Sequence, residues 1–179
     1  MSYYDKVGTY YDKDAVDFEQ RYHENPALQG IRQSFRQHTK SYEQTTVLEV
    51  GFGPGFDLVH FAEQFPDRKF YGIDISAEMV RLTQEKIDRM GLKNAWVAKG
   101  SVEDIKVLFP GVQFDMIYVF FGALNTVNDL EGAFVDLRVV LSSGGRMVLT
   151  FVNKYYIAGT LIELLKLKPR RICGRELEI

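Results

Sequence analysis

The feature that most constrains this sequence is a glycine loop between a short apolar run and a helix-like segment. Residues 51–55 carry glycine at every second position and directly follow the apolar run 47–50. Apolar side chains at the spacing of a buried helix come next: Phe56, Leu58, Val59, Ala62 and Phe65. Glycine lets backbone approach a ligand where a Cβ would clash, and a helix N-terminus presents unpaired amides. This order of strand, loop and helix predicts a nucleotide-type binding site.

The rest of the chain predicts an α/β fold. From residue 46 onward, short apolar runs alternate with helix-period segments, which is typical of a mostly parallel sheet with helices on both faces. Ser76 and Gly91 bound one predicted helix, and Asp129 precedes another. The expected strands are 47–50, 69–73, 95–98, 114–120 and 146–151. Because 179 residues are too few for two independent cores, we expect a single Rossmann-like, doubly wound domain.

The first 45 residues contain helix-period stretches and no convincing strand. Asn25 and Pro26 are typical of a helix N-cap and first turn. The apolar face expected for that helix consists of Leu28, Ile31, Phe35 and Tyr42. We therefore predict that residues 1–45 form a helical cap of the same domain as residues 46–179. The tyrosine-rich part, residues 2–14, is expected to act as a lid.

Composition limits the classes of function. The 22 Lys and Arg residues against 24 Asp and Glu residues give a net charge of -2, so we expect no nucleic acid as a partner. A single cysteine and three scattered histidines show no disulfide pair and no metal-ligand spacing, so no metal is expected. There is no apolar run of about 20 residues and no leader-like start, which favours a cytoplasmic protein without a membrane span.

The spacing of the glycine loop disfavours a dinucleotide. That fingerprint needs a third small residue, which packs the helix against the strand. Counted from Gly51 this position is Phe56, and counted from Gly53 it is Leu58. An NAD-dependent oxidoreductase is therefore the weaker alternative.

The loop instead resembles the first motif of class I S-adenosylmethionine-dependent methyltransferases, and the resemblance extends over about residues 46–153. The residues that carry it are Glu49, Gly51, Gly53 and Gly55. In that family an acidic residue at the end of the second strand holds both ribose hydroxyls. Asp74 stands at the matching position, which would place Ile75 against the adenine. The resemblance also implies the strand order 3-2-1-4-5.

Four further cofactor-binding residues follow from the same resemblance. Ser101 and Val102 match the motif after the third strand, although Ser101 stands where aspartate is usual. Phe120 matches the loop facing the methionine end, and Tyr11 matches a tyrosine that folds over the cofactor. Alternatives remain for several positions. The glycine loop can be a turn that binds no ligand, and Asp74 can simply cap a helix. Glu49 can bond to amides of the loop, and Ser101 can be a turn residue. The tyrosines can form a hydrophobic contact that holds the helical cap.

The resemblance implies an enzyme that uses S-adenosylmethionine and releases S-adenosylhomocysteine. No Asn-Pro-Pro-Tyr-type motif follows the fourth strand, where the apolar residues Phe120 and Phe121 stand instead. We therefore expect a small-molecule or lipophilic acceptor. No catalytic residue is assigned, because acceptor-binding residues in this family lie on variable segments. A non-catalytic S-adenosylmethionine-binding module is the alternative.

The end of the sequence departs from the family. Residues 153–179 are too few for the helix and antiparallel hairpin that usually follow the fifth strand. We expect this hairpin to be missing, which would leave the fifth strand as an open edge. The chain would then be a truncated form with weak turnover, or it would form a homo-oligomer through that edge.

Overall fold

The structure is a computed structural model that describes residues 2–152, and its centre is a parallel sheet. The five strands are ordered β3-β2-β1-β4-β5, and all four pairs are parallel. They are β1 (Thr46–Val50), β2 (Lys69–Asp74), β3 (Ala95–Lys99), β4 (Phe114–Val119) and β5 (Leu141–Leu149). The predicted fold class and strand order are confirmed.

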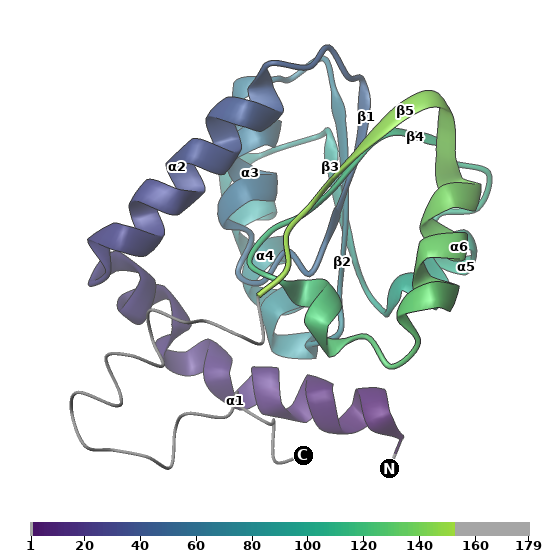
Figure 1. The fold of residues 1–179 in the computed structure, drawn as a ribbon. Coiled ribbons are helices and arrows are strands. Elements are labelled where there is room, and N and C mark those ends of the chain that lie inside the picture. The colour runs from purple at the N-terminus through teal and green to yellow at the C-terminus, as the bar shows by residue number, and fades with distance from the viewer. Residues whose placement is uncertain (1, 153–179) are drawn as a thin grey trace, which may run out of the picture.

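Helices cover both faces of the sheet and its carboxyl edge (Figure 1). On one face lie α2 (Pro26–Lys40), α3 (Phe56–Gln64) and α4 (Ala77–Met90). On the other lie α5 (Ile105–Leu108) and α6 (Leu130–Val140), with the short 3-10 helices η1 (Val102–Asp104) and η2 (Ala123–Thr126) in the connecting loops. Helix α1 (Tyr3–His23) crosses the carboxyl ends of the strands. Every ligand at this edge therefore lies next to α1.

Alternation along the strands divides the hydrophobic core into two layers. Successive strand residues point to opposite faces, so Leu48 and Ile117 pack in one cluster and Val47 and Met116 in the other. The first cluster includes Leu137 of α6. All five side chains are at most 1% exposed. The glycine loop after β1 is thus anchored on a strand that is buried on both faces.

The expected helix ends are confirmed. The Ser76 hydroxyl accepts the Met79 N–H at 3.1 Å, and Gly91 ends α4 in the left-handed conformation with φ 66°. Asn25 and Asp129 cap α2 and α6 in the same way as Ser76 caps α4.

The start of the fifth strand was predicted wrongly. We expected residues 146–151, whereas β5 begins at Leu141, directly after α6. Leu141 pairs with Phe114 and Arg146 pairs with Met116, so an irregularity between them absorbs the extra residues. Gly144, with φ 76°, lies within this irregularity. Gly144 and Gly145 therefore lie in a bulge inside the strand and not in a turn before it.

The predicted apolar face of α2 is also wrong in part. Ile31 is 44% exposed and Tyr42 lies beyond the end of the helix, whereas Arg32 is only 7% exposed. Arg32 faces the body of the protein because Asp57 of α3 pairs with it. No helix among residues 2–152 is long and apolar enough to cross a membrane. The expectations about the missing hairpin and the end of the chain concern residues outside the described part.

Candidate functional site

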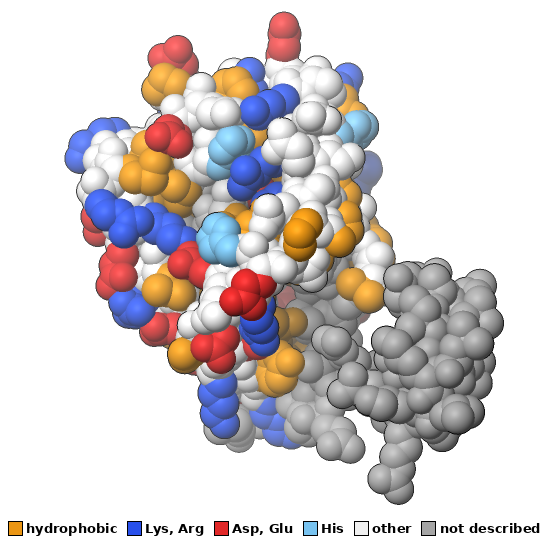
Figure 2. Space-filling model, turned by 90° about the vertical axis from the view of Figure 1, so that its left-hand side faces the viewer, with side chains coloured by type: hydrophobic (Ala, Val, Ile, Leu, Met, Phe, Trp, Pro, Cys, Tyr) orange, Lys and Arg blue, Asp and Glu red, His pale blue; other side chains and the backbone are white. Residues whose placement is uncertain are grey.

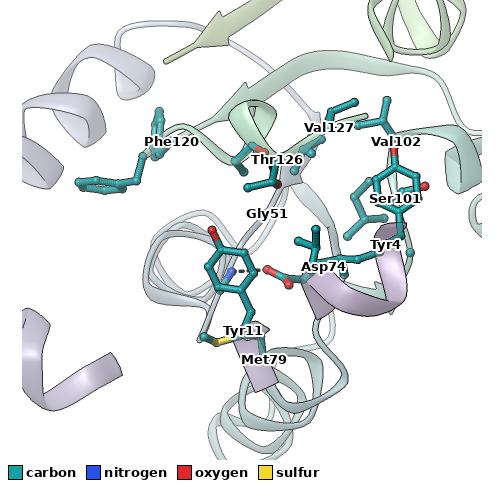
Figure 3. A pocket seen from close by; sticks show the side chains of 18 of the residues that line it. Tyr4, Tyr11, Gly51, Asp74, Met79, Ser101, Val102, Phe120, Thr126 and Val127 are labelled. Atoms are coloured by element: carbon teal, nitrogen blue, oxygen red, sulfur yellow. Dashed lines mark hydrogen bonds between the residues drawn. The ribbon is translucent and has the colours of Figure 1, made fainter. Parts of the chain in front are cut away.

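A pocket of about 240 Å³ lies between α1 and the carboxyl ends of β1, β2 and β4. We call it the strand-end pocket. Its lining is mostly apolar, and eight of the ten predicted cofactor-binding residues contribute to it: Tyr11, Gly51, Gly53, Asp74, Ile75, Ser101, Val102 and Phe120. Residues from five separate segments thus converge here (Figure 3). Glu49 and Gly55 do not line it.

The glycine loop has one position with room for a ligand. A Cβ on Gly51 would lie 2.3 Å from Ala123 Cβ, and one on Gly55 would lie 2.6 Å from Thr83 Cγ2. These two glycines are therefore required by packing within the protein. A Cβ on Gly53 would meet nothing within 4 Å, although Gly53 lines the pocket and has φ 55°. The open space beside Gly53 suits close approach of a ligand to the backbone.

Asp74 is the buried carboxylate of the strand-end pocket. Its Oδ2 accepts the Gly53 N–H at 2.8 Å (Figure 3). Its Oδ1 accepts the Ser76 N–H at 2.9 Å. Burial raises the pKa of Asp74 to about 6, against the lowering effect of these two hydrogen bonds. Each carboxylate oxygen keeps a further acceptor site, so the group can still receive hydroxyl donors from a ligand.

Ser101, Val102 and Tyr4 lie at one end of the pocket (Figure 3). The Ser101 hydroxyl bonds to Asp104 Oδ2 at 3.1 Å and so caps the short helix that begins at Val102. The Tyr4 hydroxyl donates to Glu103 Oε1 at 2.6 Å, and burial and this bond raise the pKa of Tyr4 to about 12. Sequence reasoning did not select Tyr4 for the site. Its distance of 99 residues from Glu103 left no local signal.

Helix α1 is held over the pocket at a second point. Asp12 Oδ1 accepts the Ser76 hydroxyl at 2.6 Å and the Glu78 N–H at 3.0 Å, which joins α1 to the start of α4. The neighbouring Tyr11 ring lines the pocket, and burial raises the pKa of its hydroxyl. A Cβ on Gly8 would lie 2.9 Å from the Ile75 carbonyl oxygen, so α1 is in direct contact with the loop between β2 and α4.

Glu49 is buried behind the glycine loop. Its Oε2 accepts the Tyr118 hydroxyl at 2.8 Å, and the residue is 3% exposed. Burial, followed by the negative charge of Asp57, raises the pKa of Glu49 well above its ordinary value. Its other oxygen has no hydrogen-bond partner among residues 2–152. Glu49 therefore supports the glycine loop from behind and keeps one oxygen without a partner in this part of the chain.

The other end of the pocket is aromatic. Phe18, Phe120 and Phe121 line it, and the Phe35 ring lies 5.0 Å from the Phe120 ring and 5.6 Å from the Phe121 ring. Phe121 is the one non-glycine residue of the described part with a positive φ, 55°. The Arg32 guanidinium lies 4.5 Å from the centre of the Phe121 ring. Only the pair 120–121 was visible as an apolar loop in the sequence.

A charge cluster supports this aromatic end from behind. Asp57 of α3 is fully buried and pairs with both Arg32 and Arg36 of α2. Arg36 Nε lies 2.7 Å from Asp57 Oδ1, and its Nη2 donates to the Phe56 carbonyl at 2.5 Å. Sequence reasoning missed the cluster, since a charged helix residue is usually solvated. No group of His, Cys, Asp and Glu in the described part has a metal-binding arrangement.

The comparisons with known proteins agree with this fold and pocket. Residues 41–176 match the family model described as "Methyltransferase domain", which is more than half of the chain. The chain belongs to the methyltransferase domain family. A solved structure of the DhpI–SAH complex matches with a TM-score of 0.65 and 19% identity, over 83% of this chain and 69% of that one. This neighbour supports the methyltransferase fold predicted from the sequence.

Two relatives illustrate the range of acceptors in the family. A tRNA (guanine-N(7)-)-methyltransferase of Edwardsiella ictaluri is 35% identical over 80 residues, which are 44% of this chain and 34% of that protein. Malonyl-(acyl-carrier protein) O-methyltransferase 1 of Ilyobacter polytropus is 31% identical over 117 residues, 65% of this chain and 41% of that protein. The matched part thus spans less than half the length of these relatives.

The expectation that nucleic acid plays no part is contradicted by these matches. Relatives named as tRNA and ribosomal RNA methyltransferases are 35% and 39% identical over the matched segments. The physical error lies in the use of net charge. A total of -2 averages over the whole surface, whereas a polyanion responds to the local arrangement of cations.

Proposed function

We propose that the strand-end pocket binds S-adenosylmethionine and that the protein transfers its methyl group to a small-molecule or lipophilic acceptor. The observation that carries the proposal is the pair formed by Asp74 and Gly53. A buried carboxylate that can accept ribose hydroxyls stands next to a backbone position with open space. Family membership and neighbours solved with S-adenosylhomocysteine support the same cofactor.

The lining suggests one orientation for the cofactor. Asp74 lies near the middle of the pocket, where its oxygens would accept both ribose hydroxyls. Ile75 and Val102 give apolar surfaces for the adenine, close to Ser101. The methionine part would then extend along the glycine loop toward Phe120. All ten predicted residues keep their assigned roles in this proposal, with Glu49 and Gly55 acting from behind the loop.

Methyl transfer requires little covalent chemistry from the protein. The bound sulfonium supplies an electrophilic methyl group, and the acceptor atom donates an electron pair to it while the carbon–sulfur bond breaks. The residues of this chain align the acceptor, exclude water and stabilise charge. Tyr11 and Phe120 line the pocket, and aromatic faces stabilise a nearby cation. A dedicated nucleophile of the protein is therefore not part of the proposal.

The aromatic end supports an apolar acceptor. Phe18 and Phe121 border the pocket there without a charged side chain between them, and Phe35 fixes the position of both loop rings. A planar or aliphatic group would replace water on these rings, which contributes about 25 cal/mol per Å² of buried apolar surface. The O-methyltransferase among the relatives is named for a malonyl group on an acyl-carrier protein, which is an acceptor other than a nucleic acid.

The first experiment tests the cofactor. Calorimetric titration with S-adenosylhomocysteine should show binding, and titration with NADH or ATP should show none. Asp74→Ala should weaken binding about ten- to a hundredfold or more, because two hydrogen bonds to a charged group are lost and each contributes about 1.5–3 kcal/mol. Ser101→Ala should weaken binding less, because the Ser101 hydroxyl already bonds to Asp104. Unchanged affinity of Asp74→Ala would remove the carboxylate from the site.

A guanine base of RNA is the second candidate acceptor, and the named relatives favour it. Radiolabelled methyl transfer to a panel of phenols, fatty acids and acyl thioesters should be compared with transfer to transfer RNA. Label in the small-molecule products, with loss in Phe121→Ala, is the expected result. Label found only in RNA would mean that RNA, and not a small molecule, is the acceptor. A cytoplasmic location and self-association through β5 stay predictions.

A further inference from the structure

A second hollow lies on the outer face, where the end of α1 meets α2, α3 and α4. Its volume is about 500 Å³ and its lining is largely polar. We call it the outer hollow. Figure 2 views this face and shows basic and histidine side chains close together. The lining residues that matter here are His23, Gln33, Arg36, His60, Glu63 and Lys86.

The floor of the outer hollow carries an excess of positive charge. Arg32 and Arg36 share one carboxylate, Asp57, so one of the two guanidinium charges is not balanced within the cluster. Nearby Glu49 forms no ion pair with either arginine, and its hydrogen bond joins it to Tyr118 instead. Buried charges without a counter-ion are costly, which favours a bound anion.

Among residues 2–152, Arg36 and His60 each keep a donor in the outer hollow that has no acceptor. Arg36 uses Nε and Nη2 within the protein, while its Nη1 makes no hydrogen bond among residues 2–152. The His60 ring also makes none within this part of the chain and lines the same hollow. Lys86, in contrast, is held by Glu19 and by the Pro54 carbonyl oxygen. Within the described part of the chain, Arg36 and His60 therefore each keep an N–H group that a ligand can accept.

The titration of His60 agrees with a positive potential in this hollow. Burial, together with the charges of Arg36 and Lys40, lowers the pKa of His60 to about 4. Its ring is therefore neutral at pH 7 and offers one N–H as a donor. The carboxylate among the lining residues is Glu63, an exposed side chain of α3.

We propose that the outer hollow binds a phosphate group. A phosphate presents several acceptor oxygens, which match an arginine N–H and the N–H of a neutral histidine ring. Arg36 Nη1 and the His60 ring would donate to it, and the amide of Gln33 lies in the same lining. The site is separate from the strand-end pocket, because their linings share no residue. The proposal does not depend on methyl transfer.

Histidine NMR tests the proposal directly. In a titration with inorganic phosphate, the ring signals of His60 and His23 should shift and saturate in the millimolar range. His38 provides the internal control, since its ring bonds to Tyr42 outside the hollow. No saturable shift of His60, or an equal shift of all three histidines, would overturn the site.

Two matched variants locate the phosphate. Gln33→Glu places a negative charge in the lining and should weaken phosphate binding about threefold, as expected for an exposed charge pair. Gln37→Glu adds the same charge to an exposed position of α2 outside the lining and should leave binding unchanged. Equal effects of the two variants would contradict a phosphate in the hollow. Asp74→Ala should leave phosphate binding intact, which separates this result from any failure of the cofactor proposal.

A competition experiment identifies the source of the phosphate. A uridylate oligonucleotide of about ten residues is added to the phosphate-bound protein while His60 is observed. Displacement of phosphate at a lower concentration supports the site and assigns it to a nucleic acid backbone. Phosphate binding that the oligonucleotide does not displace supports the site and assigns it to a small phosphorylated molecule.

Discussion

The strand-end pocket and the outer hollow lie on two sides of one glycine loop. Gly51 and Gly53 line the strand-end pocket, whereas Gly55 and Phe56 line the outer hollow. The first lining is largely apolar around the carboxylate of Asp74, and the second is polar with unbalanced guanidinium charge. Neither character is visible in a net charge of -2. The class of ligand that each site can bind therefore follows from its local lining and not from the composition of the chain.

The largest effect that separates the two sites is expected from Gly53→Val. A branched side chain would fill the open space beside the backbone, so binding of S-adenosylhomocysteine should fall below detection in calorimetry. The matched control is Gly91→Val, because Gly91 also has a positive φ and open space but ends α4 away from both sites. The two variants should lose similar stability, while only Gly53→Val loses the cofactor. Cofactor binding by Gly53→Val would break the assignment of the strand-end pocket.

The next effect concerns the charge cluster below the outer hollow. Asp57→Ala leaves the buried guanidinium of Arg32 and the half-buried guanidinium of Arg36 without their carboxylate and should lower the free energy of unfolding by roughly 3–5 kcal/mol. Asp136→Ala removes only the exposed pair with Lys106 and should cost at most about 1 kcal/mol. Urea denaturation of both variants measures the difference. Equal losses would mean that the cluster is hydrated and carries no excess charge.

A smaller effect is expected from pH at the strand-end pocket. The pKa of Asp74 is about 6, and ribose hydroxyls bind its ionised form. Affinity for S-adenosylhomocysteine should therefore be constant above pH 7 and fall as the pH decreases through 6, by about tenfold at pH 5. Asp74→Asn removes the titrating group, so its weaker binding should not change over this range. A wild-type affinity that stays flat to pH 5 would exclude a bond between the ionised carboxylate and the ligand.

The smallest effect sharpens the prediction that residues 2–14 act as a lid over the strand-end pocket. Tyr4→Phe removes the hydrogen bond to Glu103, worth about 1 kcal/mol, and should speed hydrogen exchange in the first turns of α1 about fivefold. Tyr10→Phe is the control, because Tyr10 is 49% exposed and its hydroxyl has no partner in the described part. Added S-adenosylhomocysteine should slow exchange in the wild type. Equal exchange with and without it would leave α1 as a fixed cap.

The family resemblance implied the strand order, while the strands of the sheet and eight of the residues that line the strand-end pocket were predictable from the sequence. These features depend on signals that are local along the chain. Apolar runs mark strands, Ser76 and Gly91 mark helix ends, and the glycine loop follows its strand directly. Carboxyl ends of parallel strands meet at one edge, so Gly53 and Asp74 had to lie close together once the fold was known.

Only the tertiary structure decided the surroundings of that loop. Arg32 looks like a solvated helix residue, yet Asp57, 25 residues later, draws it into the interior. Glu49 keeps its place in the motif but accepts a hydrogen bond from Tyr118 of a different strand, and burial raises its pKa. The outer hollow needs side chains from four helices at once. The periodicity of one segment predicts which of its apolar side chains are buried. The burial of a charged side chain also depends on a residue of opposite charge that is distant in the sequence.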